Sequence, residues 1–273
     1  MPTTSNGNVL LYYDVAGQGE PVLWLQGTGA DHSAWTVQTI HFSRHFRCIL
    51  PDNRDTGQSG RSPHPYDLRT LAEDALCVLN AAGERDAHVV GLSMGAGIAQ
   101  ELALLAPERV RSLALLSGFA QADARMRAAT SLWPELYERL GRVMFHRHME
   151  PWLFSPSFFE HPSNLRPLRR YVEQARHPQD AHAFARQVEA SNTHDTRGRL
   201  HEIRARTLVV HGDQDLLVPP AHGRQLAEGI PAARFELRPG IAHSVNLEGQ
   251  RPFNKLLEGF FSQSAAQGRP YSA

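Results

Sequence analysis

The fold is decided by the stretch Ala87-His88-Val89-Val90-Gly91-Leu92-Ser93-Met94-Gly95-Ala96-Gly97. It passes from an apolar run, typical of a buried strand, through Gly-x-Ser-x-Gly to small residues that open a helix. Glycines on both sides of Ser93 allow the helix to pack close to the strand that it leaves. The stretch therefore predicts a serine nucleophile on a sharp strand-to-helix turn, with its hydroxyl turned outward.

Strand-like and helix-like segments alternate on both sides of this turn. Helices are predicted over Leu68–Ala82, which stops at Gly83, and over Ser93–Leu105, which stops before Pro107. Apolar runs predict strands at Val9–Val15, Val22–Leu25, Phe46–Pro51, Ala87–Gly91, Val110–Ser117, Thr207–His211 and Arg234–Arg238. This alternation predicts an α/β fold with a mostly parallel central sheet flanked by helices.

The alternation is interrupted between residues 121 and 199, where strand signals vanish and aromatic residues accumulate. We therefore predict a core formed by residues 1–120 and 200–263, a helical cap inserted at residues 121–199, and a flexible tail at residues 264–273. The cap aromatics have two interpretations: a small hydrophobic core of the cap, or the wall of a pocket that faces Ser93. They are Trp133, Phe145, Trp152, Phe154, Phe158 and Phe159.

Composition excludes several classes of protein. Lys plus Arg and Asp plus Glu both number 28, so no net charge draws the chain to nucleic acid or to an anionic membrane. No apolar run is long enough to span a bilayer, and the polar N-terminus lacks the pattern of a secretion signal. Cys48 and Cys77 are expected to be unpaired thiols, which favours a cytoplasmic location.

A serine nucleophile requires a base, an acid that orients the base, and donors for the oxyanion. Two acids, Asp213 and Asp215, follow the predicted strand Thr207–His211, and His243 follows the predicted strand Arg234–Arg238. The ends of parallel strands meet at one edge of a sheet, where catalytic loops gather. We therefore expect His243 and one of the two aspartates to lie close to Ser93.

These motifs resemble those of the α/β-hydrolase fold superfamily, over about residues 8–261. The resemblance rests on the Ser93 turn and on three further segments: Leu25-Gln26-Gly27-Thr28-Gly29, Asp52-Asn53-Arg54-Asp55-Thr56-Gly57-Gln58-Ser59, and Gly212-Asp213-Gln214-Asp215 followed by Val218-Pro219. Within the superfamily, the chain is similar to the branch of carboxylesterases, enol-lactonases and polyketide methylesterases. The stretch Glu150–Phe158, for example, resembles the W-F-x-P-x-F segment of enol-lactonases.

The resemblance implies a role for individual residues. Ser93 would be the nucleophile, His243 the base, and Asp215 the acid, because the family's acid precedes the x-x-Val-Pro segment. The backbone amides of Met94 and Thr28 would form the oxyanion hole. The family commonly has His-Gly where this chain has Gln26-Gly27, so Gln26 would hold the oxyanion loop through its amide group.

The predicted ligand is a small-molecule ester or lactone, and no cofactor, metal, nucleic acid or membrane is expected. Trp152, Phe154, Gln26 and Trp133 are the predicted substrate-binding residues. The run His146-Arg147-His148 with Glu150 has the residue types of a metal site. Residues two apart on a helix point in different directions, so a solvated polar face is the favoured interpretation. The sequence leaves the oligomeric state open.

The predicted activity is hydrolysis of a carboxylic ester or lactone through an acyl-enzyme. The same three catalytic residues would also serve hydrolysis of a carbon–carbon bond, perhydrolysis, or a thioesterase or cyclase step in polyketide assembly. A ligand receptor without catalytic activity is the alternative from another class of protein, and the presence of Ser93, Asp215 and His243 together disfavours it.

Overall fold

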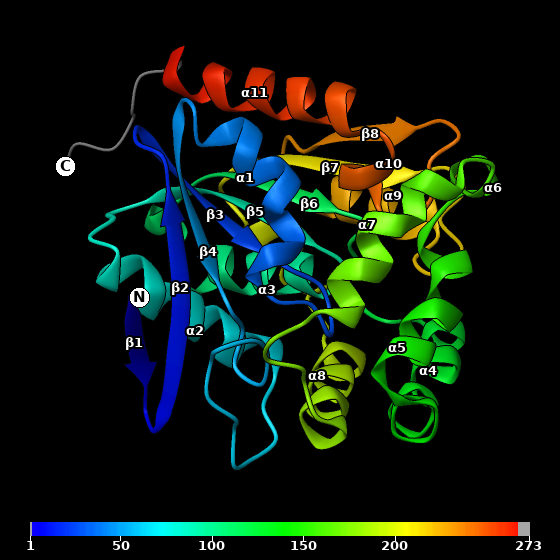
Figure 1. The fold of residues 1–273 in the computed structure, drawn as a ribbon. Helices are drawn as coiled ribbons and strands as arrows, with labels where there is room; N and C mark the ends of the chain where they lie inside the picture. Colours follow the sequence, from blue (N-terminus) through cyan, green and yellow to red (C-terminus); the bar gives the residue numbers. More distant parts are fainter. Residues whose placement is uncertain (1, 267–273) are drawn as a thin grey trace.

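The computed structural model describes residues 2–266 of the chain (Figure 1). Its centre is an eight-stranded sheet in the order β1-β2-β4-β3-β5-β6-β7-β8, in which the strands from β4 onward are parallel. The strands are β1 (Thr3–Asn6), β2 (Val9–Ala16), β3 (Glu20–Leu25), β4 (Phe46–Pro51), β5 (Ala87–Leu92), β6 (Val110–Leu116), β7 (Arg206–Gly212) and β8 (Arg234–Arg238). The predicted α/β fold with a mostly parallel sheet is therefore confirmed.

Strand β1 is the strand that the sequence analysis missed. It pairs antiparallel with β2, from Thr3 opposite Tyr12 to Asn6 opposite Val9, and Gly7 turns the chain between them with φ +57°. Its residues are polar and alternate between exposed and half-buried, so they carry no apolar pattern. An edge strand of this kind is recognised by its two-residue Gly7-Asn8 turn, and not by hydrophobicity.

Helices cover both faces of the sheet because side chains alternate along each strand. In β3, Val22 and Trp24 face one core and Leu23 and Leu25 face the other. The first core is covered by α1 (Thr36–Phe42), α10 (Val245–Glu248) and α11 (Gln250–Ala266), and the second by α2 (Leu68–Ala81), α3 (Met94–Leu105) and α9 (Pro220–Gly229). Three short 3-10 helices, His32–Trp35, Pro107–Arg109 and Leu200–Glu202, lie in the connections.

Five helices between β6 and β7 gather on one side of the molecule (green to yellow-green in Figure 1). They are α4 (Ala124–Thr130), α5 (Trp133–Leu153), α6 (Pro156–Phe159), α7 (Pro162–Glu173) and α8 (Ala181–Thr193), and α5 is kinked at Gly141, where φ is +71°. The two ends of this segment meet in a β-bridge between Gln121 and Asp195, and the Thr196 amide donates to the Ala120 carbonyl at 2.9 Å. We therefore keep residues 121–199 as the predicted cap.

The ends of the chain and its thiols complete the description. Helix α11 continues to Ala266, and residues 267–273 of the predicted tail lie outside the described residues. Within residues 2–266, no helix is both long and apolar enough to cross a membrane. Cys48 is buried in the sheet, Cys77 is half-buried on α2, and both are free thiols.

Candidate active site

Ser93 lies between the end of β5 and the start of α3, in the turn that the sequence predicts. Its backbone has φ +57° and ψ −119°, a conformation that a non-glycine residue adopts only where the surroundings enforce it. The enforcing contacts are backbone hydrogen bonds: the Ser93 amide donates to the Leu116 carbonyl, and the Ala96 amide donates to the Ser93 carbonyl, both at 2.9 Å. The serine is thus held at the top of the sheet.

Close contacts with backbone atoms explain why Gly91 and Gly95 of the motif are glycines. A Cβ atom on Gly91 would lie 2.2 Å from the Gly95 carbonyl oxygen, and one on Gly95 would lie 2.1 Å from the Leu25 carbonyl oxygen. Because these neighbours are backbone atoms, they cannot rotate away. The close packing of α3 against β5 and β3 therefore requires glycine at both positions.

His243 and Asp215 meet behind the serine turn. The Nδ1 atom of His243 lies 2.8 Å from Oδ2 of Asp215, and both side chains are almost fully buried. Oδ1 of Asp215 accepts from the amides of Leu217 at 3.0 Å and Val218 at 2.8 Å, and the His243 carbonyl accepts from the Ser117 hydroxyl at 2.7 Å. Backbone groups therefore fix the carboxylate, and the carboxylate fixes the ring.

The two aspartates that the sequence left as alternatives occupy different environments. Asp213 is exposed, and its Oδ1 accepts from the Gly240 amide at 2.8 Å, which ties two loops together. Asp215 alone of the two contacts His243. The geometry therefore favours Asp215 as the orienting acid.

The two amides predicted to bind the oxyanion lie beside Ser93. Met94 is the first residue of α3, and an amide at that position has no partner within its own helix and lies at the positive end of the helix dipole. Thr28 lies in the loop after β3, and both residues line a small cavity together with Ser93. This placement suits two donors directed at one oxygen atom.

Two buried glutamines hold the Thr28 loop. Gln26 Nε2 donates to the Pro51 carbonyl at 2.8 Å, so its amide group anchors the start of the loop where the family commonly has histidine. Gln187, on α8, accepts from the Gly29 amide at 2.9 Å. The sequence analysis missed Gln187, because the 158 residues that separate it from Gly29 leave no local signal. The loop is thus held from the core and from the cap.

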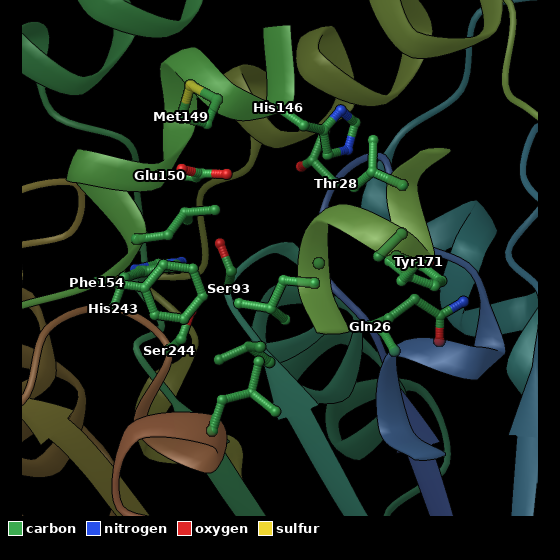
Figure 2. A pocket seen from close by; sticks show the side chains of 18 of the residues that line it. Gln26, Thr28, Ser93, His146, Met149, Glu150, Phe154, Tyr171, His243 and Ser244 are labelled. Carbon is green, nitrogen blue, oxygen red and sulfur yellow. The ribbon is translucent and has the colours of Figure 1, made fainter. Parts of the chain in front are cut away.

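A cavity of about 490 Å³ lies between the core and the cap (Figure 2). Ser93 and His243 line its core side, and the Ser93 hydroxyl points into it. Of the predicted substrate-binding residues, Gln26, Trp133 and Phe154 line this cavity. Such a volume is typical of a small-molecule site.

Trp152 requires a correction, because it does not line the cavity. Its side chain is exposed, at 37%. The residues of α5 after its kink that line the cavity are Val143, Phe145, His146, Arg147, Met149, Glu150 and Leu153. Trp152 therefore belongs to the solvent-exposed surface of α5. The aromatic composition of the segment did not distinguish this face from the one that lines the cavity.

The interpretation of His146 and Glu150 as a solvated polar face is also wrong. Both line the cavity, whereas His148 is exposed. Burial lowers the pKa of His146 to about 4, so its ring is neutral at pH 7. Glu150 is buried and forms a bidentate ion pair with Arg169 of α7, at 2.8 and 2.6 Å. The cap therefore contributes a neutral imidazole and a neutralised pair of charges to a mostly apolar wall.

Asp31, His32 and Asp52 are the group of described residues whose atoms could together hold a metal ion. Hydrogen bonds already account for their arrangement. Asp52 Oδ1 lies 2.7 Å from His32 Nδ1 and accepts from the His32 amide at 2.8 Å, while Asp31 caps the 3-10 helix by accepting from the Ser33 amide. Hydrogen bonding to Asp52 raises the pKa of His32 against the opposing effect of its burial. We assign this cluster a role in holding the loop after β3.

The chain is similar to known proteins over most of its length. Residues 20–250 match the family described as alpha/beta hydrolase fold. A putative carbamate hydrolase, RutD, from Azorhizobium caulinodans is 34% identical over 261 residues, covering 95% of this chain and 98% of that protein. Among solved structures, the enol-lactonase from Burkholderia xenovorans LB400 superimposes with a TM-score of 0.87 at 25% identity, covering 96% of this chain and 100% of that one. A thermophilic esterase from Thermogutta terrifontis gives a TM-score of 0.84 at 26% identity, with coverage of 96% and 97%.

Proposed function

Because the chain belongs to the α/β-hydrolase fold family, we propose that it is a serine hydrolase that cleaves a small-molecule carboxylic ester or lactone. The catalytic residues in this proposal are Ser93, His243 and Asp215. The observation that carries it is the 2.8 Å contact between His243 Nδ1 and Asp215 Oδ2, together with the presence of Ser93 and His243 in the wall of one cavity. The relatives named as hydrolases support the general class.

The proposed reaction begins with attack of Ser93 Oγ on the carbonyl carbon. His243 accepts the serine proton through Nε2, since Nδ1 is directed at Asp215. The Asp215 carboxylate keeps the ring in the required tautomer and stabilises the imidazolium that forms. The negative oxygen of the tetrahedral intermediate lies against the amides of Met94 and Thr28, which are already in place before the reaction.

Collapse of the intermediate breaks the bond to the alkoxy oxygen. His243 returns its proton to that oxygen, and the alcohol leaves an acyl group on Ser93. A water molecule, deprotonated by the same histidine, then attacks the acyl carbon and regenerates the free serine. For a lactone, the alcohol remains tethered to the acyl group until the second step.

A panel of substrates tests this proposal. It contains nitrophenyl esters with short and long acyl chains, lactones, enol-lactones and methyl esters, each assayed with the wild-type protein and with Ser93→Ala. Hydrolysis that exceeds the Ser93→Ala rate by at least about a thousandfold supports a covalent serine mechanism. Equal rates for the two proteins on every substrate would contradict it.

Carbamate hydrolysis is the second candidate, and the names of the curated relatives favour it. A carbamate presents the same carbonyl carbon to Ser93, with nitrogen on one side, so the same residues would serve. Nitrophenyl carbamates added to the panel distinguish it, through a higher kcat/KM than for the ester of matched size. We further propose a cytoplasmic location, which two free thiols favour.

A further inference from the structure

Ser93 lines two cavities of very different size. The large one, of about 490 Å³, contains His243 in its wall. The small one, of about 30 Å³, lies against Met94 and has Met126 and Val218 in its wall. Ser93 and Thr28 are common to both walls. A substrate carbonyl bound at Ser93 thus has a roomy side and a confined side.

The chemistry assigns the two parts of an ester to these sides. The proton of Ser93 passes to His243 and then to the alkoxy oxygen of the leaving group, as the Oγ–carbon bond forms and the carbon–alkoxy bond breaks. The leaving oxygen must therefore lie next to His243, which lines the large cavity and is absent from the wall of the small one. The carbonyl oxygen lies against the Met94 and Thr28 amides, both of which line the small cavity, and the rest of that cavity is left for the acyl substituent.

From this arrangement we propose that the substrates are esters of a very small acyl group, of formyl, acetyl or carbamoyl size, with a large apolar alcohol. At about 10–15 Å³ for one water-sized group, a cavity of about 30 Å³ has room for two such groups, which are the carbonyl oxygen and one small acyl substituent. The large cavity takes a drug-sized alcohol. This inference rests on the proposed function, because it assumes acyl transfer to Ser93.

The walls of the small cavity support the assignment. Met126 and Val218 are buried, and with Phe119 they close it on the apolar side. Its polar side carries Thr130, whose hydroxyl donates to Asn192 Oδ1 at 2.7 Å. This hydrogen bond links α4 to α8 of the cap. Residues of both the cap and the core therefore hold the walls of the small cavity in place.

Two isomeric esters test the inference, because they differ only in the direction of the ester bond. 2-Phenylethyl acetate has a small acyl group and a large alcohol, and methyl 3-phenylpropanoate has the reverse. We expect kcat/KM for 2-phenylethyl acetate to be higher by about ten- to two-hundredfold. An equal or reversed preference would overturn the inference while leaving the proposed function in place. Hydrolysis of neither ester above the Ser93→Ala rate would also overturn the inference, and the full substrate panel would then decide the proposed function.

Enlarging each cavity separately provides the matched control. Met126→Ala enlarges the small cavity, and Leu153→Ala enlarges the large one. For 2-phenylethyl acetate and butyrate, Met126→Ala should lower the acetate-to-butyrate ratio of kcat/KM by about tenfold, and Leu153→Ala should leave it unchanged. Phe119→Leu, a milder change in the same wall, serves if Met126→Ala melts below the assay temperature. An unchanged ratio in a folded Met126→Ala or Phe119→Leu protein would overturn the inference.

Discussion

The core and the cap contribute opposite walls to the same cavity, and they hold their side chains in different ways. On the core side, hydrogen bonds that involve the backbone fix the proposed catalytic residues: two backbone amides donate to Asp215, and the His243 carbonyl accepts from the Ser117 hydroxyl. On the cap side, side chains hold one another, as in the bidentate Glu150–Arg169 pair. From this difference we expect the core to determine the proposed reaction and the cap to determine which molecules reach it.

Hydrogen bonds and ion pairs join the core and the cap at several places. Gln187 of the cap accepts from the Gly29 amide, Arg186 forms a bidentate pair with Asp55 at 2.8 Å, and the Ser244 amide donates to the Leu153 carbonyl at 3.0 Å. Asp55 is completely buried, so its pair with Arg186 ties the cap to the loop after β4. We therefore expect changes in the core to abolish activity, and changes in the cap to alter selectivity.

The largest expected effects follow from changes to the proposed catalytic residues. His243→Ala should lower kcat by about four to six orders of magnitude, because the serine loses its base. Asp215→Asn should lower it by about four orders, because the ring loses its orienting carboxylate. The double variant Ser93→Ala with His243→Ala should be little worse than either single variant, since both residues act in one proton transfer. If the losses of activation free energy in the two single variants added up in the double variant, Ser93 and His243 would not act in one proton transfer.

A large effect on stability is expected at the serine turn. Gly95→Ala places a Cβ atom 2.1 Å from a backbone oxygen of β3, so the free energy of unfolding should fall by about 3 kcal/mol. Gly259→Ala is the matched control, because Gly259 lies on the exposed face of α11 with no atom within 4 Å of the added Cβ. That variant should gain about 0.5–1 kcal/mol from helix propensity. Urea unfolding measures both, and equal effects would show that the turn tolerates a side chain.

Lowering the pH should reduce the free energy of unfolding through buried histidines in the cap and in the core. The expected effect is intermediate in size among those predicted. Burial lowers the pKa of His146 in the cap and of His211 in the sheet, each to about 4. The unfolded chain protonates these histidines near pH 6.5, so it binds more protons than the folded protein between pH 6.5 and 4. This contribution to stability is therefore complete above pH 6.5 and is lost as the pH falls toward 4. Urea unfolding at pH 7 and pH 5 measures the loss.

The contribution of one histidine is isolated by comparing two variants. His146→Gln should reduce the difference in unfolding free energy between pH 7 and pH 5, because its neutral side chain does not titrate. His45→Gln, at an exposed position, should leave that difference unchanged. The assignment of His146 as a buried neutral ring fails if both variants keep the full pH dependence.

The smallest expected effect distinguishes two aromatic residues of the cap. Phe154 is buried, lines the cavity and stacks on Phe158 with ring centroids 4.5 Å apart, whereas Trp152 is exposed. Phe154→Ala should change the relative kcat/KM among substrates of different size. Trp152→Ala should leave that ranking unchanged and cost less than about 1 kcal/mol of stability. A change of ranking in Trp152→Ala alone would restore the original prediction for this residue.

The sequence predicts the core better than the cap for a physical reason. Parallel strands bring their carboxyl ends to one edge, so Ser93, Asp215 and His243 are close to one another wherever the strands form in that order. The local pattern of each strand is therefore enough to predict that these residues lie close together. Seven of the strands lie where apolar runs predict them, whereas β1 is polar and was missed. The choice between Asp213 and Asp215 depends on which carboxylate turns inward.

In the cap, the same kind of pattern gives less information. Helices α5 and α8 pack on each other through Tyr137, Phe145 and Phe184, and Phe145 and Phe184 also line the cavity, so aromatic residues serve both the cap's own core and the cavity. The face that a residue presents depends on the kink at Gly141 and on how α5 lies over the sheet. The residue types of this segment therefore gave a wrong prediction for Trp152, which was assigned to the substrate pocket, and for His146, which was assigned to a solvated face. Only the tertiary arrangement distinguishes these positions.

Covalent labelling of the serine tests the central claim most directly. The intact protein is treated with a fluorophosphonate ester and examined by mass spectrometry, followed by peptide mapping, beside Ser93→Ala and His243→Ala. The account predicts one phosphonyl group per chain on Ser93, no label on Ser93→Ala, and labelling of His243→Ala that is slower by several orders of magnitude. Failure of the folded wild-type protein to react, or equal labelling of Ser93→Ala, would contradict Ser93 as the activated nucleophile.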